Sequence, residues 1–135
     1  MDSNRIRKLA EGARTALMTE VSASLDRVLL PESAERISFP SQVAKIEHAV
    51  KGEGRDDLIE RVAYTWFNRL CALRFMDVKG YTSTPCVSPR PGESMPAILA
   101  DARRGIFDQE LVSGETTRAQ VRGLIGGTVT SDNPL

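Results

Sequence analysis

Few residues of this chain have side chains suited to catalysis, and they are not grouped. The only histidine among the 135 residues is His48, and the two cysteines, Cys71 and Cys86, lie far from it in the sequence. A nucleophile needs a base within reach, and a zinc site needs about four ligands, mostly His and Cys at close spacing. The carboxylates on helical segments are typical of solvated surface charge rather than of a buried acid–base pair. We therefore expect no catalytic residue, no bound cofactor and no metal ion in this chain.

One pair of charges lies within an otherwise apolar stretch. Arg74 and Asp77 are three residues apart, a spacing at which two helical side chains meet. Charges on an apolar face are retained when they are paired. The pattern favours a buried ion pair, or a bridge at the end of a helix in which Arg74 caps carbonyl groups. The alternative is a docking role, in which Arg74 anchors another domain or a DNA phosphate.

A second group of charges lies near the N-terminus, where Arg7 and Glu11 have the spacing of a solvated pair on a helix face. The chain has a formal net charge of zero and a pI near 6.6, whereas a nucleic-acid-binding domain usually carries a basic excess. A solvated face is therefore the simpler interpretation of these charges. The candidates for DNA contact are the four cations Arg5, Arg7, Lys8 and Arg14.

The element that organises the chain is predicted to be a long central helix over residues 55–79. The stretch 56–81 contains five of the seven aromatic residues, since the chain has one Trp, two Tyr and four Phe in all. Apolar residues cover most of the helix circumference, which is typical of a helix packed on several sides. An acidic pair suits its N-terminus, and Lys79 followed by Gly80 suits a left-handed C-terminal cap. The predicted core residues are Trp66, Phe67, Leu70 and Phe75.

Helical periodicity predicts four further helices, and no segment alternates over the length of a strand. The proline-rich segment 81–93 is predicted to be a loop, either ordered or mobile. A length of 135 residues suffices for one domain with a single modest core. We therefore predict an all-α fold, a single irregular bundle over residues 1–135 around the central helix. The further helices are expected at about 4–30, 41–51, 94–104 and 117–126.

The composition is that of a soluble, reduced protein. Hydrophobic residues make up 41% of the chain and charged residues 27%, which are ordinary values for a globular domain. No apolar run approaches the ~20 residues needed to span a bilayer, and the N-terminal segment is charged where a signal peptide is apolar. Two cysteines are too few for a secreted disulfide scaffold. We expect a cytoplasmic protein with no membrane partner.

Two stretches resemble a known family: VAYTWFNRLCALRFMDVKGY at 62–81 and NRIRKLAEGARTALMTEV at 4–21. They are similar to the N-terminal region of the PglX family, the large adenine-specific DNA methyltransferases of BREX phage-defence systems, and of related long restriction-type methylases. The resemblance extends over residues 4–105 and is strongest over 60–81. The resemblance rests on an aromatic-rich segment that is followed by Arg74-Phe75-Met76-Asp77, and not on a catalytic motif.

The resemblance implies a parent enzyme that uses S-adenosylmethionine and whose catalytic domain is absent from this chain. The glycines at 123–127 follow a helical pattern, so we interpret them as a helix terminus rather than as a cofactor-binding turn. Asn133-Pro134-Leu135 begins like the Asn-Pro-Pro-Tyr loop that holds an extruded adenine, but lacks the second proline and the tyrosine. The implied partners are the catalytic domain of the parent chain, DNA and other defence-system proteins.

Three interpretations of function follow from these observations. The first is an N-terminal helical domain that packs on the catalytic domain of an adenine-specific methyltransferase and assists DNA or partner binding, without being an enzyme by itself. The second is a free-standing helical protein–protein interaction module with no enzymatic role. The third is a small DNA-binding helical protein, which salt-dependent DNA binding by the isolated chain would reveal.

Overall fold

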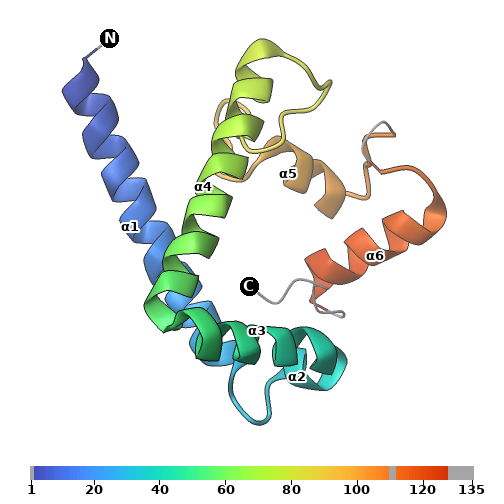
Figure 1. Cartoon of the computed structure of the whole chain (residues 1–135). Helices are drawn as coiled ribbons and strands as arrows, with labels where there is room; N and C mark the ends of the chain where they lie inside the picture. The colour runs from blue at the N-terminus through green and yellow to red at the C-terminus, as the bar shows by residue number, and fades with distance from the viewer. Residues whose placement is uncertain (1, 110–111, 128–135) are drawn as a thin grey trace. The chain divides into compact units, whose positions relative to one another are not determined.

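The computed structural model describes residues 2–109 and 112–127, and all six regular elements in this part of the chain are helices (Figure 1). The prediction of an all-α fold is confirmed. The chain divides into two compact units, whose described parts are residues 2–68 for the first and residues 69–109 and 112–127 for the second, and α4 runs from the first into the second. A single domain over 1–135 stays a prediction. The helices are α1 (Ser3–Val28), α2 (Ala34–Ser38), α3 (Pro40–Glu53), α4 (Arg55–Lys79), α5 (Ala97–Arg103) and α6 (Glu115–Gly126).

The predicted boundaries agree closely for the long helices and less well for the short ones. The long helix at 55–79 has the predicted bounds, and α6 ends at Gly126 with Gly127 as its left-handed cap, as expected for a helix terminus. The helix α5 starts at Ala97 rather than at 94, because Pro96 has ψ of 136°, outside the helical region, and a proline disfavours the helical conformation in the residue before it. The helix α2 was not predicted, since five residues are too few to show a period. Asn133-Pro134-Leu135 lies outside the described residues.

The core of the first unit is formed where α1, α3 and α4 meet. Leu25 and Ala63 are fully buried, and Val21, Leu58 and Ile59 are nearly so. The helix α3 lies across the end of α1 and the start of α4, and covers this cluster with Ile46, Ala49 and Val50 (Figure 1). Burial of each large aliphatic side chain contributes about 1.5–3 kcal/mol relative to its exposed state. This cluster is therefore the main source of stability in the first unit.

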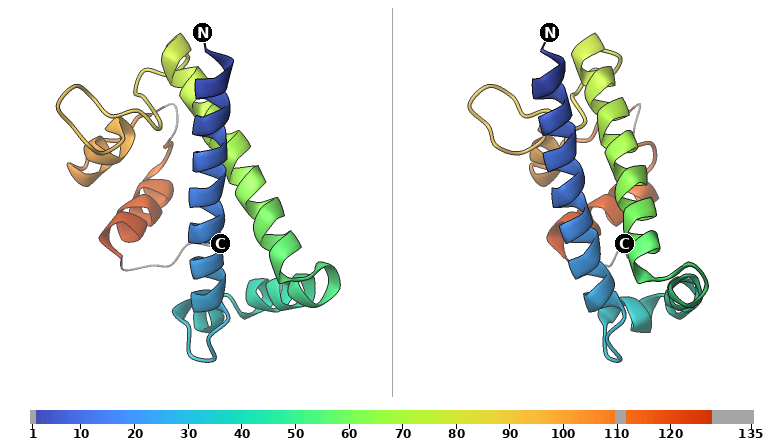
Figure 2. Two further views of the ribbon diagram at one scale, coloured as in Figure 1. Left: turned by 90° about the vertical axis from the view of Figure 1, so that its left-hand side faces the viewer. Right: turned by 60° about the vertical axis from the view of Figure 1, so that its left-hand side comes forward.

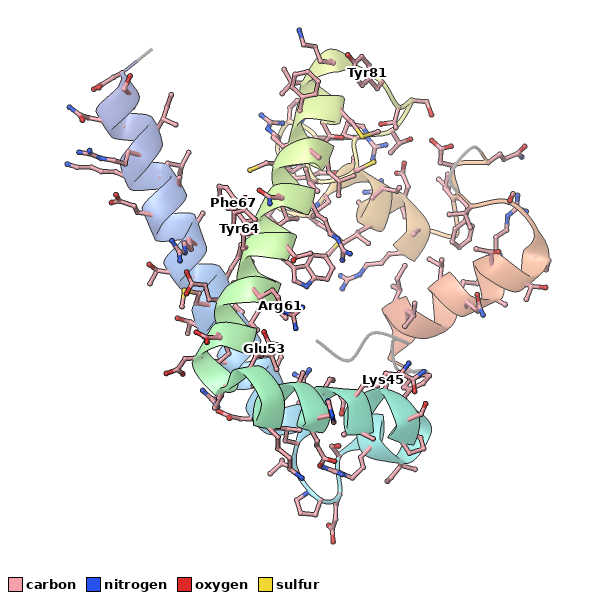
Figure 3. The ribbon with its side chains drawn as sticks, in the orientation of Figure 1. Lys45, Glu53, Arg61, Tyr64, Phe67 and Tyr81 are labelled. Atoms are coloured by element: carbon pink, nitrogen blue, oxygen red, sulfur yellow. The ribbon has the colours of Figure 1, made fainter. Side chains whose placement is uncertain are left out.

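Polar contacts fix the connections between these helices. The buried Ser33 hydroxyl donates to the carbonyl of Val28 at 2.8 Å and accepts from the Arg36 amide at 3.1 Å, so that one side chain ends α1 and caps α2. The Arg61 guanidinium donates twice to the Glu53 carboxylate, at 2.6 and 3.0 Å, and ties α4 to the end of α3 (Figure 3). Bidentate pairs of this kind set geometry as well as energy.

The prediction that α4 is packed on several sides is wrong for its second half. Leu58, Ile59 and Ala63 are its only buried residues, and all three belong to the first unit. Of the predicted core residues, Trp66 and Phe67 are half-buried, whereas Leu70 is 38% exposed and Phe75 is 54% exposed. Apolar residues surround the helix as expected, but after residue 68 the described part of the chain does not cover them on all sides.

The second unit consists of the end of α4, a long loop, and the helices α5 and α6. Among the described residues of this unit, the buried apolar ones are Ala97 and Ala102 of α5. The Arg122 guanidinium of α6 lies 5.1 Å from the centroid of the Phe107 ring, a cation–π contact within the unit. With so few buried apolar side chains, the second unit depends on polar contacts for its geometry.

Candidate docking surface

The C-terminal cap of α4 brings two aromatic rings together. Gly80 has φ of 65°, a left-handed conformation that favours glycine, and reverses the chain at the helix end. The Tyr81 amide then donates to the carbonyl of Met76 at 3.1 Å, and the Gly80 amide donates to that of Asp77 at 3.2 Å. These two hydrogen bonds form a Schellman motif, which is commonly accompanied by an apolar contact between its flanking residues. Here that contact joins Tyr81 to Phe75.

The two rings form a defined aromatic pair. Their centroids are 6.0 Å apart and the rings are inclined by 75°, an edge-to-face arrangement. The Lys79 ammonium lies 5.7 Å from the centroid of the Phe75 ring, at a distance typical of a cation–π contact. The Schellman cap therefore holds Tyr81, seen at the end of α4 in Figure 3, against Phe75.

These aromatic rings belong to an exposed apolar surface. Cys71, Phe75 and Val78 follow one another at intervals of four and three residues, so they lie on one side of α4. Phe75 is 54% exposed, Val78 66% and Tyr81 64%, and Cys71 is exposed as well. Adjacent exposed apolar side chains of this size mark sites of interaction with other molecules. We call this set, Cys71, Phe75, Val78 and Tyr81, the α4 docking surface.

The side chain of Asp77, on a different side of α4, holds the proline-rich loop. One carboxylate oxygen accepts from the amide of Cys86 at 2.7 Å. The other accepts from the amides of Val87 and Ser88, both at 2.9 Å, and from the Ser88 hydroxyl at 2.7 Å. Removal from water raises the pKa of the Asp77 carboxyl, but these four hydrogen bonds outweigh that effect and lower the pKa to about 2. The ionised carboxylate is therefore the anchor of the loop.

The predicted relation between Arg74 and Asp77 takes a different form in the structure. Arg74 is exposed, and its guanidinium donates to the Ser88 hydroxyl, which in turn donates to Asp77. Ser88 thus connects the two charges, and the interpretation as a buried ion pair is wrong. The reason is that Asp77 finds three backbone amides in the loop, which satisfy its carboxylate without the guanidinium.

A second set of polar contacts fixes the far end of the loop. Arg90 and Glu93 close a turn in which the Glu93 amide donates to the carbonyl of Arg90 at 2.9 Å, with Pro91 and Gly92 at its centre. Gly92 has φ of 81°, as a type II turn requires at this position. The Arg90 guanidinium also donates to both carboxylate oxygens of Asp101 in α5, at 2.8 and 2.7 Å. Hydrogen bonds therefore hold the loop at both ends. Of the two predictions for this segment, an ordered loop and a mobile loop, they favour the ordered one.

Sequence reasoning missed the loop residues that support this surface. The amides of Cys86 and Val87 and the hydroxyl of Ser88 carry no signal in the sequence, because backbone donors are present in every residue but proline. The pairing of Phe75 with Tyr81 did have a signal. An aromatic residue five positions before Gly80, with Tyr81 directly after it, is the spacing of the apolar contact in a Schellman motif.

The four N-terminal cations predicted to contact DNA lie on the first half of α1, in the first unit. Arg7 lies 3.9 Å from Glu11, and Arg14 forms an ion pair with Glu60 of α4. Arg5 and Lys8 are exposed and have no acidic partner among the described residues. Within the described part of the chain, two of the four cations are therefore without an acidic partner.

Neither a metal site nor a membrane span is found in the described part of the chain. Over residues 2–109 and 112–127, no group of three or more His, Cys, Asp or Glu side chains is placed to hold a metal ion. His48, the only histidine, is exposed on α3. None of the helices in these ranges is long and apolar enough to cross a membrane.

The chain is similar to a part of two adenine-specific methyltransferases. It is 59% identical over 88 residues to the adenine-specific methyltransferase BrxX of Escherichia coli O9:H4 (strain HS), covering 56% of this chain and 7% of that protein. It is 48% identical over 48 residues to the adenine-specific methyltransferase PglX of Lacticaseibacillus casei (strain Zhang), covering 34% of this chain and 4% of that protein. The chain thus spans only a small fraction of either relative. No family model matches it, and no solved structure does.

Proposed function

We propose that this chain is the N-terminal helical docking domain of an adenine-specific DNA methyltransferase of a phage-defence system, and that it packs on the catalytic region through the α4 docking surface. Its similarity to segments of two adenine-specific methyltransferases supports the connection to that enzyme class. The single observation that carries the docking role is the exposure of Phe75, Val78 and Tyr81 on one helix end. All three lie within 62–81, the stretch that carries the family resemblance.

The physical argument is that this surface costs free energy as long as it faces water. Burying an aliphatic or aromatic side chain of this size contributes about 1.5–3 kcal/mol. The pair of Phe75 and Tyr81 is preorganised by the Gly80 cap. A partner therefore finds these side chains in place and loses little conformational entropy when it covers them.

In this proposal, the catalytic region and the present domain have different functions within the enzyme. S-adenosylmethionine and the target adenine belong to the catalytic region of the parent, and this domain supplies packing area. The interpretation as a free-standing interaction module uses the same surface with a different occupant. The occupant of the α4 docking surface therefore decides between the two.

The test is binding in trans. The purified chain is titrated against E. coli BrxX from which the segment that matches this chain has been deleted, and the dissociation constant is measured by calorimetry. We expect saturable binding that Phe75→Asp weakens by at least about tenfold, because aromatic anchors of interfaces are worth about 2 kcal/mol or more. The matched control is Ile37→Asp, since Ile37 of α2 is 76% exposed and lies outside the surface. Absence of binding, or equal effects of both substitutions, overturns the proposal.

A further inference from the structure

The first half of α1 is a helix without a core. The buried residues of α1 are Val21, Leu25 and Val28, and residues 3–16 contain none. The helix nevertheless continues without interruption to Ser3 (Figure 2). There the Asp2 carboxylate accepts from the Asn4 amide at 3.0 Å and caps the helix. Isolated helices of this length are marginal in water, and their stability in proteins comes from packing of an apolar face. This half of α1 therefore has an apolar face to offer to a partner.

That face is a narrow stripe. Ile6 is 46% exposed and Leu9 is 74% exposed, and they occupy the same side of the helix. The stripe consists of Ile6, Leu9, Ala10 and Ala13, at the i, i+3, i+4 and i+7 positions of an amphipathic helix. Leu17, the next residue in this register, is partly buried and already packs against the core of the first unit.

Cations line both edges of this stripe. At 100° per residue, Arg5 falls next to Leu9 on one edge, and Arg7 and Arg14 fall next to Ala10 on the other. Arg14 is already paired with Glu60, whereas Arg7 has only an exposed neighbour, Glu11, at 3.9 Å. Arg5 has no acidic partner among the described residues. A surface that fits this stripe is therefore apolar in the middle and acidic at its rim.

We propose that the first four turns of α1 dock, apolar stripe inward, into an apolar groove with an acidic rim on the methyltransferase that carries this domain. The inference rests on the proposed function, because it takes the partner from there. An amphipathic helix in a groove is a recurrent mode of recognition, with anchors at i, i+3 and i+7, which are Ile6, Leu9 and Ala13 here. The docked helix adds a second contact to the one made by α4, and joining two contacts in one chain raises the overall affinity.

Charge and residue type argue against the other occupants. Residues 2–14 contain four cations and only two carboxylates, so each segment has a positive net charge. A second copy of this chain would place two such segments together, and like charges repel. DNA phosphates would leave Ile6 and Leu9 exposed. A membrane surface favours helices with a wide apolar face rich in Trp, Phe and Leu, whereas this stripe exposes only two large apolar side chains, Ile6 and Leu9, and no aromatic one.

The experiment uses the whole chain and the same E. coli BrxX deletion variant. Leu9→Asp is compared with Leu30→Asp, because Leu30 is 56% exposed but lies beyond α1. We expect Leu9→Asp to weaken binding by at least about tenfold and Leu30→Asp to leave it unchanged. Arg5→Glu should weaken binding severalfold at low ionic strength and less at about 1 M salt, where exposed charges are screened within ~3 Å. Circular dichroism of each variant shows whether the helices are retained.

The outcomes separate this inference from the proposed function. If the unaltered chain does not bind the deletion variant, the proposed function fails. If it binds, and Phe75→Asp weakens it while Leu9→Asp behaves like Leu30→Asp, the proposed function stands and the α1 inference is overturned. Loss of binding on nuclease treatment would also overturn the α1 inference, in favour of DNA. Light scattering that shows self-association through Leu9 would overturn it in favour of a second copy of the chain.

Discussion

The two halves of α4 have the same apolar character in the sequence and are stabilised in different ways. The first half buries Leu58, Ile59 and Ala63 against α1 and α3. In the second half, Asp77 accepts hydrogen bonds from the proline-rich loop and fixes it to the helix, while Phe75 and Val78 are exposed. Apolar packing therefore accounts for the fold of the first half. In the second half, polar contacts set the geometry and apolar side chains remain exposed.

The largest expected effect compares one substitution at two points of the same helix. Leu58 is 3% exposed and Leu70 is 38% exposed. Leu58→Ala should cost about 2–5 kcal/mol of unfolding free energy, because it removes a buried side chain and leaves a cavity. Leu70→Ala should cost less than about 1 kcal/mol. Urea denaturation of both variants measures the difference, and equal costs would show that the second half of α4 is as well packed as the first.

The next prediction concerns the polar anchor of the second half. The pKa of Asp77 is about 2 in the folded chain, below its ordinary value of 3.8. Its contribution is therefore fully present above about pH 4 and is lost as the pH falls towards 2. Asp77→Asn should lower stability at pH 7 by about 1–2 kcal/mol, after allowance for solvent screening of this half-buried group. The difference from the unaltered chain should shrink as the pH falls from 4 to 2.

The control for Asp77 is Glu20→Gln, since Glu20 is an exposed carboxylate on α1. Its effect should stay within about 0.5 kcal/mol at all pH values, as is usual for surface positions. Urea denaturation at pH 7, 4 and 2.5 measures both variants. A cost of Asp77→Asn that does not change with pH would mean that the ionised carboxylate is not the anchor of the loop.

Features that depend on neighbouring residues in the sequence were predicted correctly, whereas features that depend on residues farther along the chain were not. The bounds of α4 and its cap at Gly80 were predicted, because helix periodicity and capping are local. The exposure of Leu70 and Phe75 was not, since periodicity gives the apolar face of a helix but not what covers it. The anchoring of Asp77 was missed for a related reason. Its partners lie nine to eleven residues later in a loop and not at i+3 or i+4 on the same helix.

The smallest effects come from two glycines that differ in backbone conformation alone. No atom lies within 4 Å of the place that a Cβ would take at Gly12 or at Gly80, but Gly80 has φ of 65° and Gly12 is helical. Gly12→Ala should stabilise the chain by about 0.5–1 kcal/mol, because alanine is the better helix former. Gly80→Ala should destabilise it by about 1 kcal/mol through the left-handed conformation. Thermal unfolding measures both, and changes of the same sign would contradict the assigned cap.

The central claim is that the exposed half of α4 becomes covered when the domain joins its enzyme, and Cys71 reports on this directly. In a Cys86→Ser background, Cys71 is the only thiol, and it lies on the α4 docking surface. Its rate of maleimide modification is measured with and without the E. coli BrxX deletion variant. The control is Ile37→Cys in a chain with both native cysteines replaced by serine. The account predicts that Cys71 reacts about tenfold more slowly at a partner concentration of about ten times the Kd, where only the free fraction reacts, while residue 37 keeps its rate. An unchanged rate at Cys71 with the partner bound would contradict the account.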